Sequence, residues 1–416
     1  MSKIRIKYFG AIKEGYRDNE GWLDIKKVTV FIGSQGTGKS TIAKLISTFT
    51  WIEKALVRGD YQKKWFERKN RFKNQILTYH RLENYFLPNS DDKVMIEYQG
   101  DAYTIIYQKD ALTIKENART SYHLPQLIYI PAERNFLTYV KTLRELKLSS
   151  DSLQEFLAEF ENAKEAMRGS VALPINNVSI EYDRLNSILS LKGEAYKVKL
   201  TDASSGFQSF VPLFLVSNYL AHSIKKENEK NKAASMSDEE IKRFRKGVEE
   251  IWRNESLSDE QRRVALSVLS AKFNKTAFIN IVEEPEQNLF PASQWQALKN
   301  LLALNNMAVG NKLIMTTHSP YMINFLTIAI QGAYLQQKIH EANKNAVLLP
   351  KLNKVIPEES LIDLKDIAIY QIDAEQGDIT QLSTIEGIPS DRNYLNDFIR
   401  EGNQLFDVLL ALEEEI

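Results

Sequence analysis

A short glycine-rich stretch holds the first residues whose types and spacing could do chemistry. The segment GSQGTGKST follows the pattern G-x-x-x-x-G-K-S, in which backbone amides and a lysine surround nucleotide phosphates. In that pattern the hydroxyl after the lysine binds Mg²⁺, so Ser40 is a metal candidate and Thr41 is expected at the α-phosphate. The nucleotide candidates are Gly33, Ser34, Gln35, Gly36, Thr37, Gly38, Lys39, Ser40 and Thr41.

Two adjacent carboxylates supply a second candidate group. Residues 277–282 (AFINIV) are an apolar run typical of a buried strand, and Glu283 and Glu284 follow directly. The first carboxylate can hold the water shell of a magnesium ion, and the second can orient or deprotonate an attacking water. We therefore expect Glu283 at the metal and Glu284 in catalysis, with a solvated acidic turn as the alternative.

A histidine follows another apolar run. Residues 312–315 predict a strand, and TTHSP places His318 just after it. A histidine at the end of a strand, near a triphosphate, can donate a hydrogen bond to the γ-phosphate. His318 is thus the second catalytic candidate, although a lone histidine is more often structural.

Serines and a glycine precede a long apolar helix predicted over residues 205–224. The stretch DASSGFQS covers residues 202–209. Hydroxyl groups and free amides at a helix N-terminus attract anions. Ser205, Gly206 and Gln208 are therefore candidates for nucleotide contact, and a plain helix cap is the alternative.

The elements that must position these groups can be read from hydrophobic periodicity. The β-branched run VTVFI predicts a strand at 28–32, and helical spacing resumes after Ser40. The glycine loop therefore lies between a strand and a helix, as its pattern requires. Further strands are expected at 94–114, 127–130, 178–200 and 367–382, the last as a hairpin, and a helix at 150–167. This order predicts an α/β nucleotide fold with an antiparallel β portion and helical insertions.

In this order the motifs resemble those of ATP-binding-cassette ATPases, of the SMC-like and OLD-like branch. GSQGTGKST resembles the Walker A loop, SSGFQ the cassette signature, INIVEEPE the Walker B segment with its catalytic glutamate, and TTHSP the switch histidine. YIPAER and EPEQNLFP also fit that branch. The resemblance implies a P-loop NTPase that uses ATP and Mg²⁺.

The chain departs from that pattern at three points. Glu283 stands where the family has aspartate, and Phe207 replaces the second glycine of the signature. The glutamine of the Q-loop is not evident. Gln126, Glu133 and Arg134 are its candidates.

The resemblance also has consequences for assembly. The chain carries one set of motifs, so Ser205 and Gly206 would face the nucleotide of a second subunit in a head-to-tail homodimer or higher oligomer. ATP would hold that dimer closed, and hydrolysis would release it.

The same patterns divide the chain into three parts. An ATP-binding α/β lobe is expected over 1–57, 86–149, 178–204 and 276–416, with a basic helical insertion at 58–85. A helical signature lobe with a charged insertion is expected over 150–177 and 205–275. That insertion holds two capping-box patterns, Ser237 with Glu240 and Ser258 with Gln261, and 226–237 favours a flexible linker.

Composition limits the function classes. The chain has 416 residues, a formal net charge of zero and no cysteine. Disulfides, thiol catalysis and cysteine-ligated zinc are therefore excluded. No apolar stretch is long enough to span a bilayer, so we expect a cytoplasmic protein with no membrane partner.

Three functions remain open. The first is an ATPase that regulates a separately encoded effector, a nuclease or toxin, because chains resembling this one occur in bacterial anti-phage defence. The second is a DNA repair or recombination ATPase similar to RecF. Its support is the basic segment Arg58–Arg81, where Lys63, Lys64, Arg68 and Lys69 could contact phosphates and Trp65 or Phe66 could stack on bases. A solvated helix with a packed aromatic face is the competing interpretation. The third is a slowly hydrolysing, nucleotide-gated scaffold.

Overall fold

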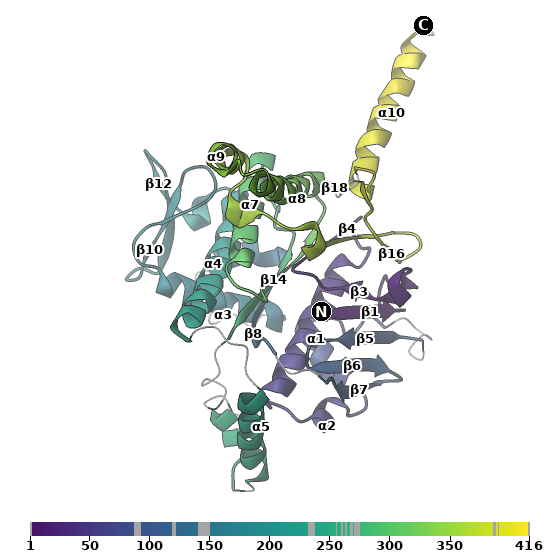
Figure 1. Cartoon of the computed structure of the whole chain (residues 1–416), viewed down its shortest axis with the longest axis vertical. Helices are drawn as coiled ribbons and strands as arrows, with labels where there is room; N and C mark the ends of the chain where they lie inside the picture. The colour runs from purple at the N-terminus through teal and green to yellow at the C-terminus, as the bar shows by residue number, and fades with distance from the viewer. Residues whose placement is uncertain are drawn as a thin grey trace.

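The architecture centres on a seven-stranded sheet with a layer on each face (Figure 1). The computed structural model describes residues 2–86, 93–118, 122–139, 150–231, 238–254, 256–258, 261–262, 264–266, 269, 275–385, 388–389 and 391–414. Statements about structure below concern these residues.

The central sheet brings distant parts of the chain side by side. Its order is β2 (Gly15–Tyr16), β16 (Asp378–Gln381), β15 (Ile367–Ile372), β4 (Val28–Gly33), β14 (Lys312–Thr317), β13 (Ala277–Glu283) and β8 (Pro125–Ile130). The five strands from β15 to β8 run parallel to one another, whereas β16 is antiparallel to β15. Because the strands are parallel, the residues that follow β4, β14 and β13 emerge at the same edge.

One face of the sheet carries the helix that follows the glycine loop. This helix, α1 (Lys39–Val57), lies between the central sheet and a five-stranded antiparallel sheet. The smaller sheet has the order β3 (Leu23–Asp24), β1 (Lys3–Lys7), β5 (Met95–Gln99), β6 (Tyr103–Gln108) and β7 (Ala111–Glu116). Phe31 of β4 faces this core, together with Ile42 and Phe49 of α1.

The opposite face is covered mainly by helices. They are α3 (Asp151–Ala166), α4 (Ser205–Asn231), α7 (Pro291–Asn306) and α8 (Pro320–Glu341). A four-stranded sheet also packs into this layer, in the order β12 (Lys197–Lys199), β11 (Ile188–Lys192), β10 (Ser179–Asp183) and β9 (Val171–Ala172). Val30 and Ile32 of β4 belong to this core. Residues on both faces of one strand therefore fill two different cores, which explains why VTVFI carries apolar side chains on both faces.

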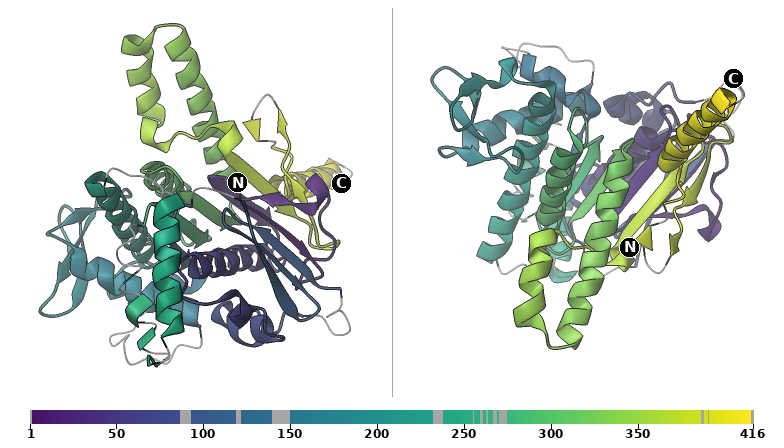
Figure 2. Two further views of the ribbon diagram at one scale, coloured as in Figure 1. Left: turned by 60° about the horizontal axis from the view of Figure 1, so that its bottom comes forward. Right: turned by 90° about the horizontal axis from the view of Figure 1, so that it is seen from above.

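The remaining elements lie at the periphery. α9 (Asn345–Val355) pairs with α8, and the pair extends from the body (Figure 2). α5 (Asp238–Arg253) lies beyond the end of α1, and α10 (Tyr394–Glu414) projects away from the rest of the molecule (Figure 1). The short elements are α2 (Lys63–Phe66), the π-helix Phe72–Ile76, β17 (Thr384–Ile385), β18 (Ile388–Pro389) and the 3-10 turns Asn19–Gly21, Leu77–His80, Ala132–Tyr139, Leu200–Asp202, Glu358–Ser360 and Leu364–Asp366.

The α/β fold with its antiparallel portion is as the sequence predicts, and one capping box is confirmed. The amide of Ser258 donates to Oε1 of Gln261 over 2.9 Å, and the amide of Gln261 donates to Oγ of Ser258 over 3.2 Å. The other pattern begins at Ser237, which lies outside the described residues. Within the expected linker, helix α4 continues to Asn231, so that part of the linker prediction is wrong.

The basic segment is made of short helical pieces. Within the expected helical insertion, Arg58–Arg81 holds a single α-helical turn, a π-helix and a 3-10 turn. Phe66 and Phe72 are fully buried, so apolar packing takes precedence over helical continuity. No helix among the described residues is long and apolar enough to cross a membrane.

Candidate nucleotide site

The loop between β4 and α1 has the backbone of an anion cradle. Gly33, Gly36 and Gly38 have φ angles of 148°, 81° and 103°, values that side chains disfavour. A Cβ atom at Gly33 would lie 2.6 Å from the carbonyl oxygen of Ile372. Glycine is therefore required where the loop passes β15, and the loop leads into the free amides that begin α1.

Lys39 occupies the centre of this cradle. Its ammonium donates to the carbonyl oxygens of Gly33 over 2.9 Å and of Ser34 over 2.6 Å. Burial lowers the pKa of Lys39 to about 8, while the charges of Glu284, Glu286 and Glu283 oppose that change. The cation is thus buried next to acidic groups, in a position where phosphate oxygens could replace the two carbonyl oxygens.

The other loop residues differ in exposure. Gln35 and Gly36 are exposed, and Ser34, Gly38 and Ser40 are partly buried. Thr37 and Thr41 are buried, at 3% and 4% exposure. Thr37 donates its hydroxyl to the carbonyl oxygen of Ser34 over 3.0 Å, which braces the loop from within.

Glu283 has the features of a carboxylate that holds a metal's water shell. It ends β13 and is 4% exposed. Its Oε2 accepts a hydrogen bond from the amide of Ala132 over 3.1 Å. Its Oε1 is buried and makes no close hydrogen bond in the described part of the chain, although the carboxylate interacts with the hydroxyl of Tyr129, whose pKa it raises. A buried carboxylate oxygen of this kind can take a further partner, and a hydrated magnesium ion would supply one.

The donor set also suits magnesium. The described residues contain no cluster of three or more histidine, aspartate or glutamate side chains able to hold a metal alone. Magnesium in nucleotide sites takes only one or two protein ligands and completes its shell with water and phosphates. Ser40 would be the direct ligand, and Glu283 would hold the ion through its water shell.

Glu284 is held in an unusual backbone conformation beside His318. Its φ angle is 45°, in the left-handed region that non-glycine residues rarely occupy. Its amide donates to the carbonyl oxygen of Thr316 over 2.9 Å. Its Oε1 lies 3.4 Å from Nε2 of His318, and the hydrogen bond from His318 lowers the pKa of Glu284. The structure therefore brings the two catalytic candidates into contact.

Glu286 fixes the turn that carries the histidine, and the sequence assignments missed it. Its Oε1 accepts hydrogen bonds from Oγ1 of Thr317 over 2.7 Å and from the amide of His318 over 2.8 Å. Burial raises the pKa of Glu286, and those hydrogen bonds oppose the rise. In the sequence, Glu286 is visible only as the third acidic residue of EEPE. The structure shows its partners, Thr317 and His318, because the ends of β13 and β14 lie side by side.

Arg134 connects the acidic turn, residues 283–286, to the start of α4. Its guanidinium is fully buried and donates to the carbonyl oxygens of Glu283 over 2.7 Å, Glu284 over 2.6 Å and Ser209 over 3.0 Å. The buried guanidinium therefore fixes the backbone of the acidic turn through its carbonyl oxygens. Of the other two Q-loop candidates, Gln126 is buried near the start of β8, at the far end from the site, and Glu133 is exposed.

The start of α4 packs against the loop that follows the acidic turn. A Cβ atom at Gly206 would lie 2.7 Å from the carbonyl oxygen of Asn288, and Nδ2 of Asn288 donates to Oγ of Ser209 over 3.0 Å. Ser205 is exposed. Gln208 is buried, and its Nε2 donates to the carbonyl oxygen of Thr201 over 3.0 Å. Its side-chain amide thus faces inward, and nucleotide contact by Gln208 stays a prediction.

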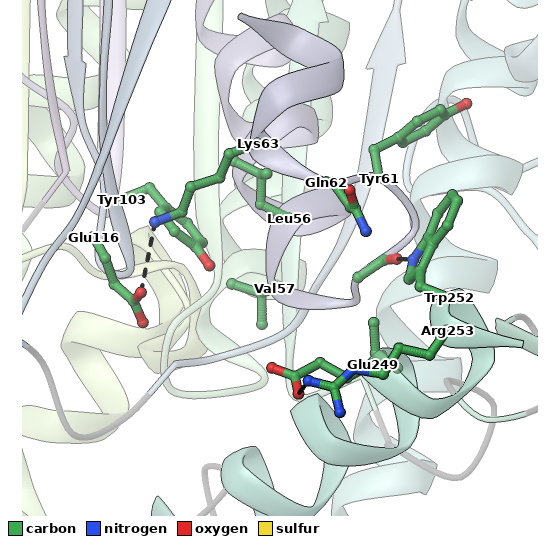
Figure 3. Close-up of a pocket in the computed structure, with 12 residues that line it drawn as sticks. Leu56, Val57, Tyr61, Gln62, Lys63, Tyr103, Glu116, Glu249, Trp252 and Arg253 are labelled. Atoms are coloured by element: carbon green, nitrogen blue, oxygen red, sulfur yellow. Dashed lines mark hydrogen bonds and ion pairs between the residues drawn. The ribbon is translucent and has the colours of Figure 1, made fainter.

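The basic segment is partly engaged within the chain. Figure 3 shows Lys63 pointing toward Glu116, with Nζ and Oε2 3.6 Å apart, and Nε1 of Trp252 from α5 bonded to the carbonyl oxygen of Gly59 over 3.0 Å. Phe66 is fully buried, so it cannot stack on a base. Lys64, Arg68 and Lys69 are exposed.

Comparisons with known proteins find likeness in structure alone. No protein-family model matches the chain, and no curated protein matches it in sequence. Among solved structures, it is similar to the SMC head domain from Thermotoga maritima, with 10% identity, a TM-score of 0.33, and coverage of 92% of this chain and 98% of that one. It is also similar to a nucleotide-free ATP-binding cassette from an ABC transporter (12%, 0.29, 93% and 93%) and to the recombination mediator protein RecF (10%, 0.30, 92% and 97%). These TM-scores are low, so the function proposed below rests on this chain's own residues.

Proposed function

We propose that this chain is an ATPase that binds ATP and Mg²⁺ at residues 33–41 and hydrolyses the nucleotide with Glu284 and His318. One observation carries the proposal. The parallel neighbours β4, β14 and β13 end at one edge of the sheet, which brings the lysine of the phosphate loop into the field of the acidic turn and places Glu284 in contact with His318.

The roles follow from the contacts. Bound magnesium would neutralise charge on the phosphate oxygens. Lys39 would exchange its two carbonyl partners for phosphate oxygens, and the amides at the start of α1 would cradle the phosphate next to it. Glu284, whose pKa is lowered, would be ionised and able to orient or deprotonate the attacking water. His318 would donate to the γ-phosphate, and Glu284 would orient its ring.

The proposed assembly is a head-to-tail dimer closed by ATP. Ser205 is exposed at the start of α4, where hydroxyl and amide groups could reach a nucleotide held by a second copy. Contacts made only with the γ-phosphate present would make the dimer a switch.

The first test is the mass of the Glu284→Gln protein in solution, measured by light scattering with and without ATP and Mg²⁺. The amide keeps the shape of the side chain but cannot act as a base, so nucleotide binding should remain while hydrolysis stops. We expect a monomer that becomes a dimer only with ATP. The matched control combines Glu284→Gln with Lys39→Ala and should stay monomeric. A mass that does not respond to ATP would overturn the dimer cycle.

Phosphate release from the parent chain tests the chemistry separately. Release that is abolished by Lys39→Ala and by Glu284→Gln supports the ATPase. ATP-dependent dimerisation without measurable release would favour the slowly hydrolysing scaffold instead.

We further propose that the switch acts on a separate effector protein, as in anti-phage systems. Helix α10 supports a partner. Four of its apolar residues, Phe398, Leu405, Leu409 and Leu412, repeat with heptad spacing and are more than half exposed; Ile399, Phe406 and Val408 are exposed to a similar degree. The charged residues of the helix are mostly acidic, with Asp397, Glu401, Asp407, Glu413 and Glu414 against Arg400. Like charges disfavour self-pairing, so charge complementarity favours a partner groove that is apolar and rimmed by lysine or arginine.

Co-expression with the product of an adjacent gene tests this surface. The double variant Leu405→Asp with Leu409→Asp should abolish complex formation, because charges on the seam would be buried in the groove. The control, Asn403→Asp, adds charge to the opposite face and should bind normally. If the double variant instead lowers the mass of the isolated protein, α10 pairs with a second copy and the effector role of this helix is wrong.

A further inference from the structure

A cavity of about 260 Å³ lies along the flank of α1, beyond the residues assigned to ATP. Its walls come from α1, the basic segment, β8 and α3. The residues that matter are Trp51 and Lys54 of α1, Trp65, Tyr79 and His80 of the basic segment, and Tyr129 of β8. None of them belongs to the phosphate loop, the acidic turn or the signature.

One wall of this cavity is aromatic. The ring of Tyr61 lies 4.4 Å from Trp65 and 6.0 Å from Trp51, measured between centroids. The guanidinium of Arg71 lies 4.4 Å from the Trp65 ring. Trp51 is 39% exposed, so part of this wall is accessible from solvent. Indole and phenol faces of this kind favour a flat aromatic ligand.

One polar group that lines this cavity is His80, which is 1% exposed. Neither of its ring nitrogens has a hydrogen-bond partner among the residues that the structure describes. Burial, with a smaller contribution from Lys44, lowers the pKa of His80 to about 3. The ring is therefore neutral and offers one donor and one acceptor. Leaving both unpaired in the interior is costly, which points to a ligand that supplies partners.

Charged groups lie around the same space. Lys54 lines the cavity, and burial lowers its pKa to about 8. Glu155 of α3 also lines it and accepts a hydrogen bond from the hydroxyl of Tyr79. A ligand with ring nitrogens and exocyclic amino or keto groups would find both a donor and acceptors here.

We propose that this cavity binds a nucleobase, at a site separate from the ATP site. A cavity of about 150 Å³ takes a benzene-sized ring, so the larger space here fits a one- or two-ring base between the indoles and His80. Lys64, Arg68 and Lys69 are exposed on the same segment. The base could therefore belong to a free nucleotide or to a single strand, and both sources share the same recognition chemistry.

The cavity also touches the ATP site through one side chain. The ring of Tyr129 lies 4.6 Å from His80, between centroids. Burial, and then the charge of Glu283, raise the pKa of Tyr129. Because the two sites are neighbours, the probe must not bind at the phosphate loop. Nucleosides without phosphates meet this condition.

The experiment titrates the full chain with adenosine, guanosine, cytidine, uridine and a four-nucleotide single strand, and follows binding by calorimetry. Lys39→Ala serves as the background, so that the phosphate loop contributes nothing. Trp65→Ala removes one indole of the aromatic wall, and His80→Phe keeps a ring but removes both hydrogen-bonding atoms. Trp22→Ala is the matched control, because Trp22 is also half-buried and carries Arg5 4.8 Å from its ring.

We expect at least one nucleoside to bind, with affinity weakened about tenfold by Trp65→Ala, reduced by His80→Phe and unchanged by Trp22→Ala. Binding of the strand alone, with the same losses, would also support the site and would assign the base to a nucleic acid. The proposal is overturned if no probe binds the folded protein, or if the Trp65→Ala and Trp22→Ala proteins bind alike. Circular dichroism checks folding. If Trp65→Ala unfolds, His80→Phe decides the matter.

Discussion

Lys39 shows how the candidate site is prepared at the scale of one residue. Its ammonium is buried and held by two carbonyl oxygens of the loop. Neutral carbonyl oxygens compensate a buried charge less well than phosphate does. The pKa of Lys39 is therefore lowered by burial to about 8. A polyanion that enters the loop should raise this pKa and keep the lysine charged.

ATP affinity should therefore depend on pH through Lys39. The free protein's pKa is lowered, so above about pH 8 the lysine is mostly neutral, and binding must take up a proton. Affinity should fall by up to roughly tenfold per pH unit above that value. Calorimetry between about pH 7 and pH 10 measures the slope, and proton uptake follows from buffers of different ionisation enthalpy. Lys39→Met should bind weakly without this slope. A flat profile for the parent would contradict the assignment.

At the scale of elements, α1 joins the phosphate loop to the five-stranded sheet. Glu53, near its end, is buried and accepts hydrogen bonds from the amides of Ala102 over 2.6 Å and Tyr103 over 3.1 Å, and from the hydroxyl of Tyr98 over 3.1 Å. Burial raises its pKa from 4.5 to about 7, against those hydrogen bonds. The Glu53 carboxyl group therefore connects the helix to the sheet, and its burial favours the protonated form in spite of these hydrogen bonds.

Glu53→Gln should reveal the cost of that buried charge. The folded pKa lies above the unfolded one, so the folded state binds more protons between about pH 4.5 and pH 7. The stability of the parent relative to the variant should fall as pH rises through that window, by up to about 3 kcal/mol. Urea unfolding of both proteins at about pH 5 and about pH 8 measures this difference. Equal pH dependence of the two proteins would show that Glu53 stays ionised in the fold.

At the scale of the whole molecule, the central sheet separates two hydrophobic cores, and the candidate site lies at the edge where β4, β14 and β13 end. The helix α4 that carries the signature residues packs against the loop after the acidic turn of its own chain. Ser205 stays exposed at the start of that helix. A complete site would then need residues from two copies, which makes the oligomer part of the catalytic proposal.

Mixing two inactive variants tests that arrangement. Lys39→Ala disables the phosphate loop, and Ser205→Arg blocks the contact made across the dimer. Each protein alone should fail to hydrolyse ATP. Their mixture should regain turnover, because a mixed dimer holds one site with an intact loop from one copy and an intact Ser205 from the other. Phosphate release measures the outcome. Activity of Ser205→Arg alone, or no rescue on mixing, would count against a shared site.

Much of the candidate site could be anticipated from the order of strands and polar residues. Apolar runs that end in GSQGTGKST, EE and TTH indicate three strand ends with chemistry attached, and all three runs are strands. The projecting helix α10 was not anticipated, because its apolar residues are exposed rather than buried in a core. The pattern of the basic segment predicts a helical insertion, but not its division into short pieces around the buried side chains of Phe66 and Phe72.

The sequence by itself determined the parts that depend on local chemistry: a glycine loop between a strand and a helix, carboxylates after a buried strand, and alternating strands that need two covered faces. The tertiary structure decided what depends on neighbours far apart in the chain. Arg134 donates to carbonyl oxygens of the acidic turn, and Glu286 holds the histidine turn. These contacts join residues that lie up to 150 positions apart, and hydrophobic period and residue type carry no information about such pairs.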